Sequence, residues 1–104
     1  MFGVIKKLLG IGSKSDLSEI IANGAQIIDV RTPGEYSSGH LKGSVNIPLD
    51  TLSSRLSKLK KDQAVITCCA SGMRSQAAKN ILISVGFSHV YNGGSWHNLR
   101  KYDK

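Results

Sequence analysis

Short apolar runs alternate along the chain with stretches in which apolar residues recur every three or four positions. Residues 26–30 and 64–68 are five-residue apolar runs rich in β-branched side chains, too short for helices, and they predict two buried strands. Residues 44–47 and 89–91 are shorter runs of the same kind. Strand and helix patterns alternate throughout, which predicts an α/β fold with a mostly parallel sheet.

The stretches between the strands have helical spacing. Thr32 and Glu35 can form a capping box, with Pro33 at the first helical position. We expect the longest helix after Ser75, ending at Gly86. The other helices are expected to begin near Asp16, at Asp50 (with Leu52, Leu56 and Leu59 on one side) and at Ser95.

The size and composition are those of one globular domain. The chain has 104 residues, of which 40% are apolar and 20% charged. We expect an N-terminal basic and apolar arm over residues 1–14 and the domain over residues 15–104. Residues 1–11 place apolar side chains on one helical face, and we expect them to cover an apolar patch of their own domain rather than to contact a membrane surface.

The net charge of +7 raises the question of nucleic-acid binding. The basic residues are scattered, with one short cluster at Lys58, Lys60 and Lys61, and aromatic residues are not interleaved with them. We therefore do not expect a nucleic-acid partner. A positive surface favours the arrival of small anionic substrates, although it also simply keeps a protein in solution.

The two cysteines, Cys68 and Cys69, are adjacent. Neighbouring Cα atoms lie closer together than ordinary disulfide geometry allows, so we expect two free thiols and a reducing, cytoplasmic location. The histidines have no metal-ligand spacing with each other or with the cysteines, and we predict neither a metal site nor a cofactor.

The segment 68–75 (Cys-Cys-Ala-Ser-Gly-Met-Arg-Ser) lies between a predicted strand and the longest predicted helix. Backbone N–H groups in such a loop, together with the helix dipole, stabilise an anion. A thiolate formed there is the reactive state of cysteine. This position therefore predicts an enzyme with a cysteine nucleophile, in a pocket that we expect to be shallow and open because the chain is short.

Two registers of this loop are compatible with catalysis. Counted from Cys68, Arg74 completes C-x5-R, which matches the bare phosphatase signature. Counted from Cys69, Gly72 lies three residues on, where such loops carry their glycine. Cys68 continues the strand alternation, so we interpret it as a small buried hydrophobic residue, while a role in resolving an oxidised Cys69 stays open.

Residues 69–75 resemble the C-x-x-G-x-R-S loop of single-domain rhodanese-like sulfurtransferases. Residues 29–36 (Asp-Val-Arg-Thr-Pro-Gly-Glu-Tyr) and 39–49 (Gly-His-Leu-Lys-Gly-Ser-Val-Asn-Ile-Pro-Leu) are similar to the same family's upstream segment. Residues 86–87, 90–91 and 93–94 also match, so the resemblance spans about residues 15–100. The aromatic residue after the double glycine, Trp96, comes earlier than is usual in the family.

The resemblance implies a five-stranded, mostly parallel sheet between helices, and transfer of a sulfane sulfur from thiosulfate or a persulfide to a thiol or cyanide acceptor. Cys69 is then the nucleophile that becomes a persulfide, and Arg74 binds an anionic donor. The loop that holds the persulfide consists of Ala70, Ser71, Gly72, Met73, Arg74 and Ser75. Asp29 and Arg31 would support that loop by hydrogen bonds. The alternatives are a phosphatase or arsenate-reductase-like enzyme working from Cys68, and a non-catalytic module that receives sulfur from a relay protein.

Four residues have a structural interpretation that competes with a functional one. Arg31 and Glu35 are spaced like a surface ion pair around a helix start. We expect His40 to make a structural hydrogen bond rather than to act as a general base. Trp96 is expected to pack in the core rather than to line the pocket.

Overall fold

The computed structural model describes residues 17–103. The predicted arm over residues 1–14, the apolar face of residues 1–11 and the cap at Asp16 lie outside these residues. The helices and strands, with η for 3-10 helices, are α2 (Ser18–Ala22), β1 (Gln26–Asp29), α3 (Pro33–Ser37), β2 (Val45–Asn46), η2 (Leu49–Ser54), η3 (Leu56–Lys58), β3 (Val65–Cys69), α4 (Met73–Ser84), β4 (Val90–Ser95), α5 (Trp96–Leu99) and η4 (Arg100–Tyr102).

The strands form one parallel sheet in the order β2-β1-β3-β4. Over residues 17–103 the sheet has four strands, where the resemblance implied five. Because all the strands run in one direction, their carboxyl ends meet at the same edge, where the loops after β1 and β3 lie. The predicted parallel α/β fold is confirmed.

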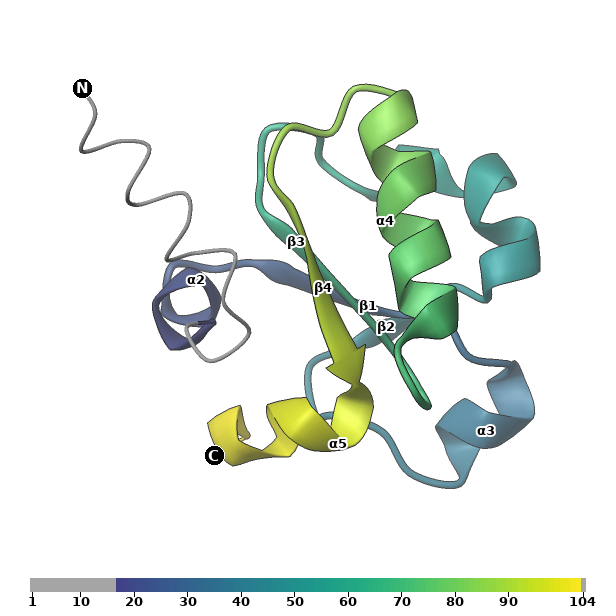
Figure 1. Ribbon diagram of the computed structural model, residues 1–104, viewed down its shortest axis with the longest axis vertical. Coiled ribbons are helices and arrows are strands. Elements are labelled where there is room, and N and C mark those ends of the chain that lie inside the picture. The colour runs from purple at the N-terminus through teal and green to yellow at the C-terminus, as the bar shows by residue number, and fades with distance from the viewer. Residues whose placement is uncertain (1–16, 104) are drawn as a thin grey trace.

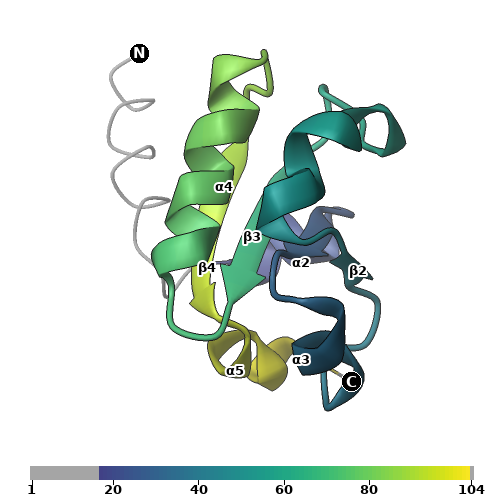
Figure 2. The same ribbon diagram turned by 90° about the vertical axis from the view of Figure 1, so that its right-hand side faces the viewer.

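Helices cover both faces of the sheet (Figures 1 and 2). On one face α4 and η2 pack over a core that includes Ile28, Val65 and Leu82. On the other face α2 and α5 pack over a smaller core that includes Ile66 and Leu99. Alternate residues of β3 therefore point into different layers, which is the geometry of a strand buried on both sides.

Several local predictions are confirmed. Thr32 caps α3 in a complete capping box: the Thr32 hydroxyl accepts from the Glu35 amide, and the Glu35 carboxylate accepts from the Thr32 amide. The Ser95 hydroxyl caps α5 by accepting from the His97 amide. Gly86 follows Val85, the C-cap of α4, and adopts φ +106°, as a glycine that ends a helix does.

The predicted α-helix at Asp50 is wrong in type. Residues 49–54 and 56–58 form two 3-10 helices, and Pro48 rather than Asp50 precedes the first of them. The hydroxyls of Thr51 and Ser54 bond to main-chain carbonyls three residues earlier, at 3.1 and 2.9 Å. Such bonds compete with the α-helical pattern and favour the tighter turn.

The last strand is longer than the predicted run of residues 89–91, because Asn92, Gly93 and Gly94 continue β4 as far as Ser95. A Cβ atom on Gly93 would lie 2.9 Å from Ile66 Cγ2 and 3.0 Å from the Thr67 carbonyl oxygen. Glycine is needed here for close approach of two strands, a use that sequence does not distinguish from a turn.

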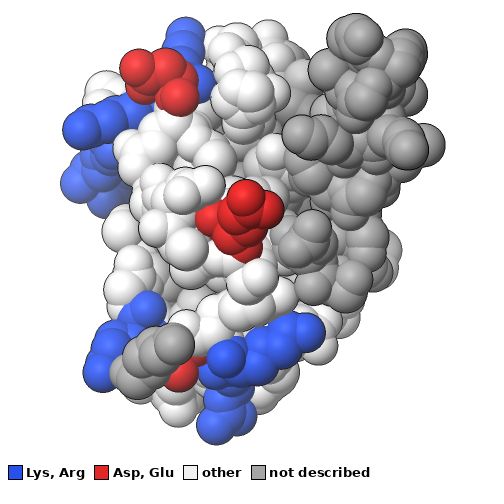
Figure 3. All heavy atoms as spheres, turned by 90° about the vertical axis from the view of Figure 1, so that its left-hand side faces the viewer, with Lys and Arg blue, Asp and Glu red and all other residues white. Residues whose placement is uncertain are grey.

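The charged side chains on the face shown in Figure 3 form separate groups. Lys and Arg gather at its upper and lower ends, with uncharged surface and an acidic side chain between them. This face carries no continuous basic stripe among the residues described. No helix within residues 17–103 is long and apolar enough to cross a membrane.

Candidate active site

The loop that follows β3 places a cysteine beneath the start of the longest helix. Cys69 is the last residue of β3, and α4 begins four residues later at Met73. Gly72 occupies the N-cap position with φ +111°, a left-handed conformation that side chains disfavour. The glycine offset that favoured the Cys69 register therefore corresponds to a real bend in the backbone.

The Cys69 sulfur is held by hydrogen-bond donors from this loop. The main-chain amides of Gly72 and Ser75 donate to Sγ at 2.9 and 3.3 Å, and the Ser75 hydroxyl lies 3.6 Å from it. Burial raises the pKa of Cys69, but the Ser75 hydroxyl and the amides of Ser75, Gly72 and Ser71 outweigh burial and lower the pKa overall. The loop thus stabilises the thiolate, the reactive state of the side chain.

The sulfur is less open than expected from so short a chain. Cys69 is 0% exposed, whereas Ala70, Ser71 and Met73 of the same loop are exposed. The expectation of a shallow, open pocket is not met at the Cys69 sulfur itself, which solvent does not reach. The loop turns its amides inward to the sulfur and its side chains outward.

Asn92 supports the loop and was not identified from sequence. Its Oδ1 accepts from the Ser75 hydroxyl at 2.6 Å and from the Gly94 amide at 2.8 Å, and its Nδ2 donates to Gln76. The register between β3 and β4 shifts here, since Thr67 pairs with Asn92 but Cys69 pairs with Ser95. The signal available in the sequence was a polar side chain toward the carboxyl end of β4, the strand next to β3, which carries Cys69.

Asp29 and Arg31 form a buried ion pair, and they do not bond directly to loop 70–75 in the described structure. Arg31 donates to both Asp29 carboxylate oxygens at 2.8–3.1 Å, and its remaining donors reach the carbonyls of Glu35 and Gly39. The pair therefore fixes α3 and the turn after it. The supporting role predicted for these residues acts on α3 rather than on the cysteine loop.

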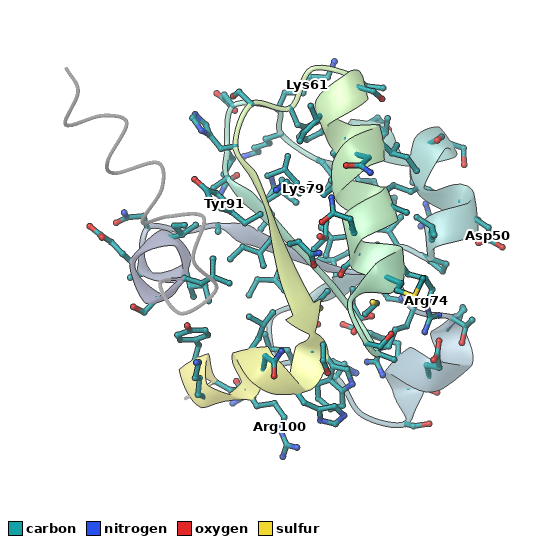
Figure 4. All side chains as sticks on the ribbon, viewed as in Figure 1. Asp50, Lys61, Arg74, Lys79, Tyr91 and Arg100 are labelled. Carbon is teal, nitrogen blue, oxygen red and sulfur yellow. The ribbon has the colours of Figure 1, made fainter. Side chains whose placement is uncertain are left out.

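Glu35 connects α3 to the cysteine loop. Its carboxylate accepts from both terminal nitrogens of Arg74, at 2.8 and 3.0 Å, across 39 residues of sequence. Figure 4 shows Arg74 extending from the start of α4 toward α3. The ion pair suggested by the spacing of Arg31 and Glu35 is wrong, because each side chain has another partner and only the Glu35 carbonyl meets Arg31.

Cys68 lies on the opposite side of the sheet from Cys69. Its side chain belongs to the layer of Ile66 and Leu99, while Cys69 belongs to the layer of α4. Burial, followed by the neighbouring Asp29 carboxylate, raises the pKa of Cys68 to about 12. The interpretation of Cys68 as a small buried residue is confirmed. Its raised pKa keeps the thiol protonated, whereas a nucleophile or resolving thiol reacts as the thiolate.

The remaining candidates have structural contacts. His40 Nδ1 lies 2.8 Å from the Tyr36 carbonyl oxygen and its ring stacks on Tyr36, as a structural histidine would. Trp96 is partly buried, packs against the smaller core and lies under the Arg31 guanidinium. Within residues 17–103, no three potential ligands cluster in a way that could hold a metal.

A small cavity of about 270 Å³ lies beside the loop. Its lining combines apolar side chains with the acid Asp50 and the loop's own Arg74. The lining residues are Val30, Thr32, Pro48, Leu49, Asp50 and Arg74.

Comparison with known proteins agrees with this architecture. The family model described as "Rhodanese-like domain" matches residues 13–98. Thiosulfate sulfurtransferase PspE of Escherichia coli is 39% identical over 74 residues, covering 69% of this chain and 71% of that protein. The uncharacterised protein YqhL of Bacillus subtilis is 40% identical over 68 residues, 65% of this chain, but this chain spans only about half (54%) of its length.

Two solved structures extend the agreement to three dimensions. A rhodanese from Escherichia coli solved with anions has a TM-score of 0.68 and 35% identity, covering 72% of this chain and 91% of that one. The human single-domain sulfurtransferase TSTD1 has a TM-score of 0.75 over 86% of this chain and 94% of that one, and at 24% identity it supports the fold alone. The resemblance inferred from the sequence motifs is therefore confirmed, and this chain belongs to the rhodanese-like domain family.

Proposed function

We propose that this protein is a sulfurtransferase in which Cys69 carries a sulfane sulfur as a persulfide. The observation that carries the proposal is the set of inward-pointing amides of Gly72 and Ser75 at the Cys69 sulfur. The same donors that stabilise a thiolate can stabilise the negative charge of a persulfide. The names of relatives such as PspE support the same reaction class.

The reaction has two sulfur-transfer steps. In the first, the Cys69 thiolate attacks the outer sulfur of thiosulfate or of a persulfide; the new S–S bond forms as the donor's S–S bond breaks, and sulfite or a thiolate leaves. In the second, a thiolate or cyanide acceptor attacks the outer sulfur of the Cys69 persulfide. The acceptor leaves with that sulfur, and the Cys69 thiolate is regenerated.

Other residues in and around the loop have supporting roles in this proposal. Ser75 and Gly72 hold the charged sulfur, Asn92 positions the Ser75 hydroxyl, and Arg31 with Asp29 fixes the neighbouring α3. Cys69 is buried while Ala70 and Ser71 of the same loop are exposed, so the loop has to open for a donor to contact the sulfur. A sulfur-relay protein that carries its own persulfide is a suitable donor, and the free state of both thiols suits a reducing cytoplasm.

Intact-mass spectrometry after incubation with thiosulfate or a low-molecular-weight persulfide tests the proposal. We expect a gain of one sulfur atom that maps to Cys69, that a thiol reverses and that Cys69→Ser lacks. Persulfide formation with a donor protein but not with small donors would favour the relay role. No gain of sulfur from any donor would overturn the proposal.

A further inference from the structure

The only basic side chain of the cysteine loop is already neutralised. Arg74 projects from the loop, and both of its terminal nitrogens donate to the Glu35 carboxylate. Each side chain is about one-third exposed, at 35% for Arg74 and 36% for Glu35, so the pair lies at the surface beside the loop.

Glu35 is held in this position from three directions. Its Oε1 accepts from the Thr32 amide at 2.9 Å as part of the capping box. Its carbonyl accepts from Arg31 at 3.3 Å, and Arg31 is itself fixed by the buried Asp29. The Arg74 guanidinium also lowers the pKa of Glu35 to about 2, which keeps the carboxylate charged at every physiological pH.

Arg74 is the only cationic side chain that lines the cavity beside the loop. Of its lining residues, Arg74 alone is basic, Asp50 adds a negative charge, and the rest are apolar apart from Thr32. A doubly charged donor such as thiosulfate that enters this cavity must therefore compete with Glu35 for Arg74, whereas an organic group in the cavity meets mainly apolar side chains. The sulfur itself is bound by neutral amides, which do not select for a second negative charge.

We propose that Glu35 determines donor specificity by occupying Arg74, so that the site disfavours small free anions and takes its sulfur from an organic persulfide. This inference rests on the proposed sulfurtransferase function and names its donor class. The Cys69 thiolate attacks the outer sulfur of the persulfide RSSH; the Cys69–sulfur bond forms, the donor S–S bond breaks, and RS⁻ leaves with the bonding electrons.

Two alkylating reagents of similar size test the charge selection without requiring sulfur transfer. Iodoacetamide is neutral and iodoacetate is an anion, and both alkylate a thiolate with loss of iodide. The measurement is the ratio of their second-order rate constants at Cys69, read by peptide mass spectrometry. We expect Glu35→Gln to raise the iodoacetate-to-iodoacetamide ratio about fivefold, the size expected for an exposed ion-pair partner.

Matched variants separate this effect from a change in fold or in overall charge. The amide introduced by Glu35→Gln retains a side-chain oxygen that can accept from the Thr32 amide, so the capping box is preserved. Glu19→Gln removes the same charge from an exposed position on α2 and should leave the ratio unchanged. In an Arg74→Gln background, Glu35→Gln should give a distinctly smaller gain, because there is no guanidinium to release.

Equal gains from Glu35→Gln in the presence and in the absence of the Arg74→Gln substitution would overturn the inference. So would a Glu19→Gln effect as large as that of Glu35→Gln. With sulfur donors, the wild type should show a higher kcat/KM for an organic persulfide than for thiosulfate, and Glu35→Gln should shift that preference toward thiosulfate. An unshifted preference contradicts the inference. Absence of persulfide from every donor would instead contradict the proposed function, while the alkylation ratio would still report on Glu35.

Discussion

Cys68 and Cys69 are neighbours in sequence, yet the sheet separates their thiols into different layers. Cys68 lies among Ile66 and Leu99, where burial and the Asp29 carboxylate raise its pKa to about 12. Cys69 is equally buried, at 0% exposure, but its pKa is lowered because loop donors reach its sulfur. The comparison shows that burial alone does not decide thiol chemistry; the direction of nearby amides does.

The largest expected difference between the two thiols is in sulfur transfer. Cys69→Ser should lower kcat/KM for sulfane sulfur transfer by at least about 10³-fold, because it removes the nucleophile. Cys68→Ala should stay close to wild type. Persulfide sulfur would be measured as thiocyanate formed from cyanide, and a large loss in Cys68→Ala with Cys69→Ser active would reverse the assignment.

Thiol reactivity as a function of pH should separate the pair next. In the folded protein, Cys69 should be alkylated by iodoacetamide with a half-maximal rate below the pH at which an ordinary cysteine reacts, since its pKa is lowered. Cys68 should react only after unfolding. Mass mapping of each cysteine across a pH series, with and without urea, measures this; equal profiles in native protein would show that the loop confers no advantage.

Removing the loop hydroxyl should bring Cys69 partway toward the behaviour of Cys68. Ser75→Ala deletes the hydroxyl next to Sγ, so we expect a higher Cys69 pKa and about a tenfold slower sulfur transfer, the size of one hydrogen bond to a charged group. Ser84→Ala is the matched control, because that hydroxyl bonds only to the Ile81 carbonyl at the far end of α4. A rate loss without any change in the alkylation pH profile would contradict this role.

The last difference concerns Cys68 and is confined to alkaline pH. Its pKa is raised in the folded state, so folded protein keeps a proton that unfolded protein loses, and stability falls as pH rises from about 9 to about 12. Within that window the free energy of unfolding of Cys68→Ala should fall less steeply with pH than that of the wild type, by about 1.4 kcal/mol per pH unit. At neutral pH the free energies of unfolding of the two proteins should differ by an amount that does not depend on pH. Urea unfolding of both proteins at several pH values measures the slopes; parallel slopes would mean that Cys68 ionises freely in the fold.

The features predicted correctly from the sequence are those that a local rule decides. The apolar run at 64–68, the capping box of Thr32 and Glu35, and the glycine three residues after Cys69 each predicted a feature that the structure contains. Local rules failed at Asp50, where hydroxyl bonds within the segment favoured a 3-10 helix, and at Gly93, where another strand approaches closely.

Partners far apart in sequence could not be read from spacing. Glu35 lies four residues from Arg31 but pairs with Arg74, 39 residues away. The Arg31 guanidinium is occupied by the Asp29 carboxylate. Asn92 bonds to Ser75, 17 residues away, at the carboxyl end of the sheet, where the β3–β4 register shifts.

By itself, the sequence determined the parallel α/β architecture and the rhodanese-like loop, and it singled out Cys69 as the proposed nucleophile, since each depends on residue type over a short span. The tertiary structure alone decided the depth of the Cys69 sulfur, the neutralisation of Arg74 and the support from Asn92. These properties arise where separate strands and helices meet at one edge of the sheet, and the distances between such elements are set by packing rather than by any single segment.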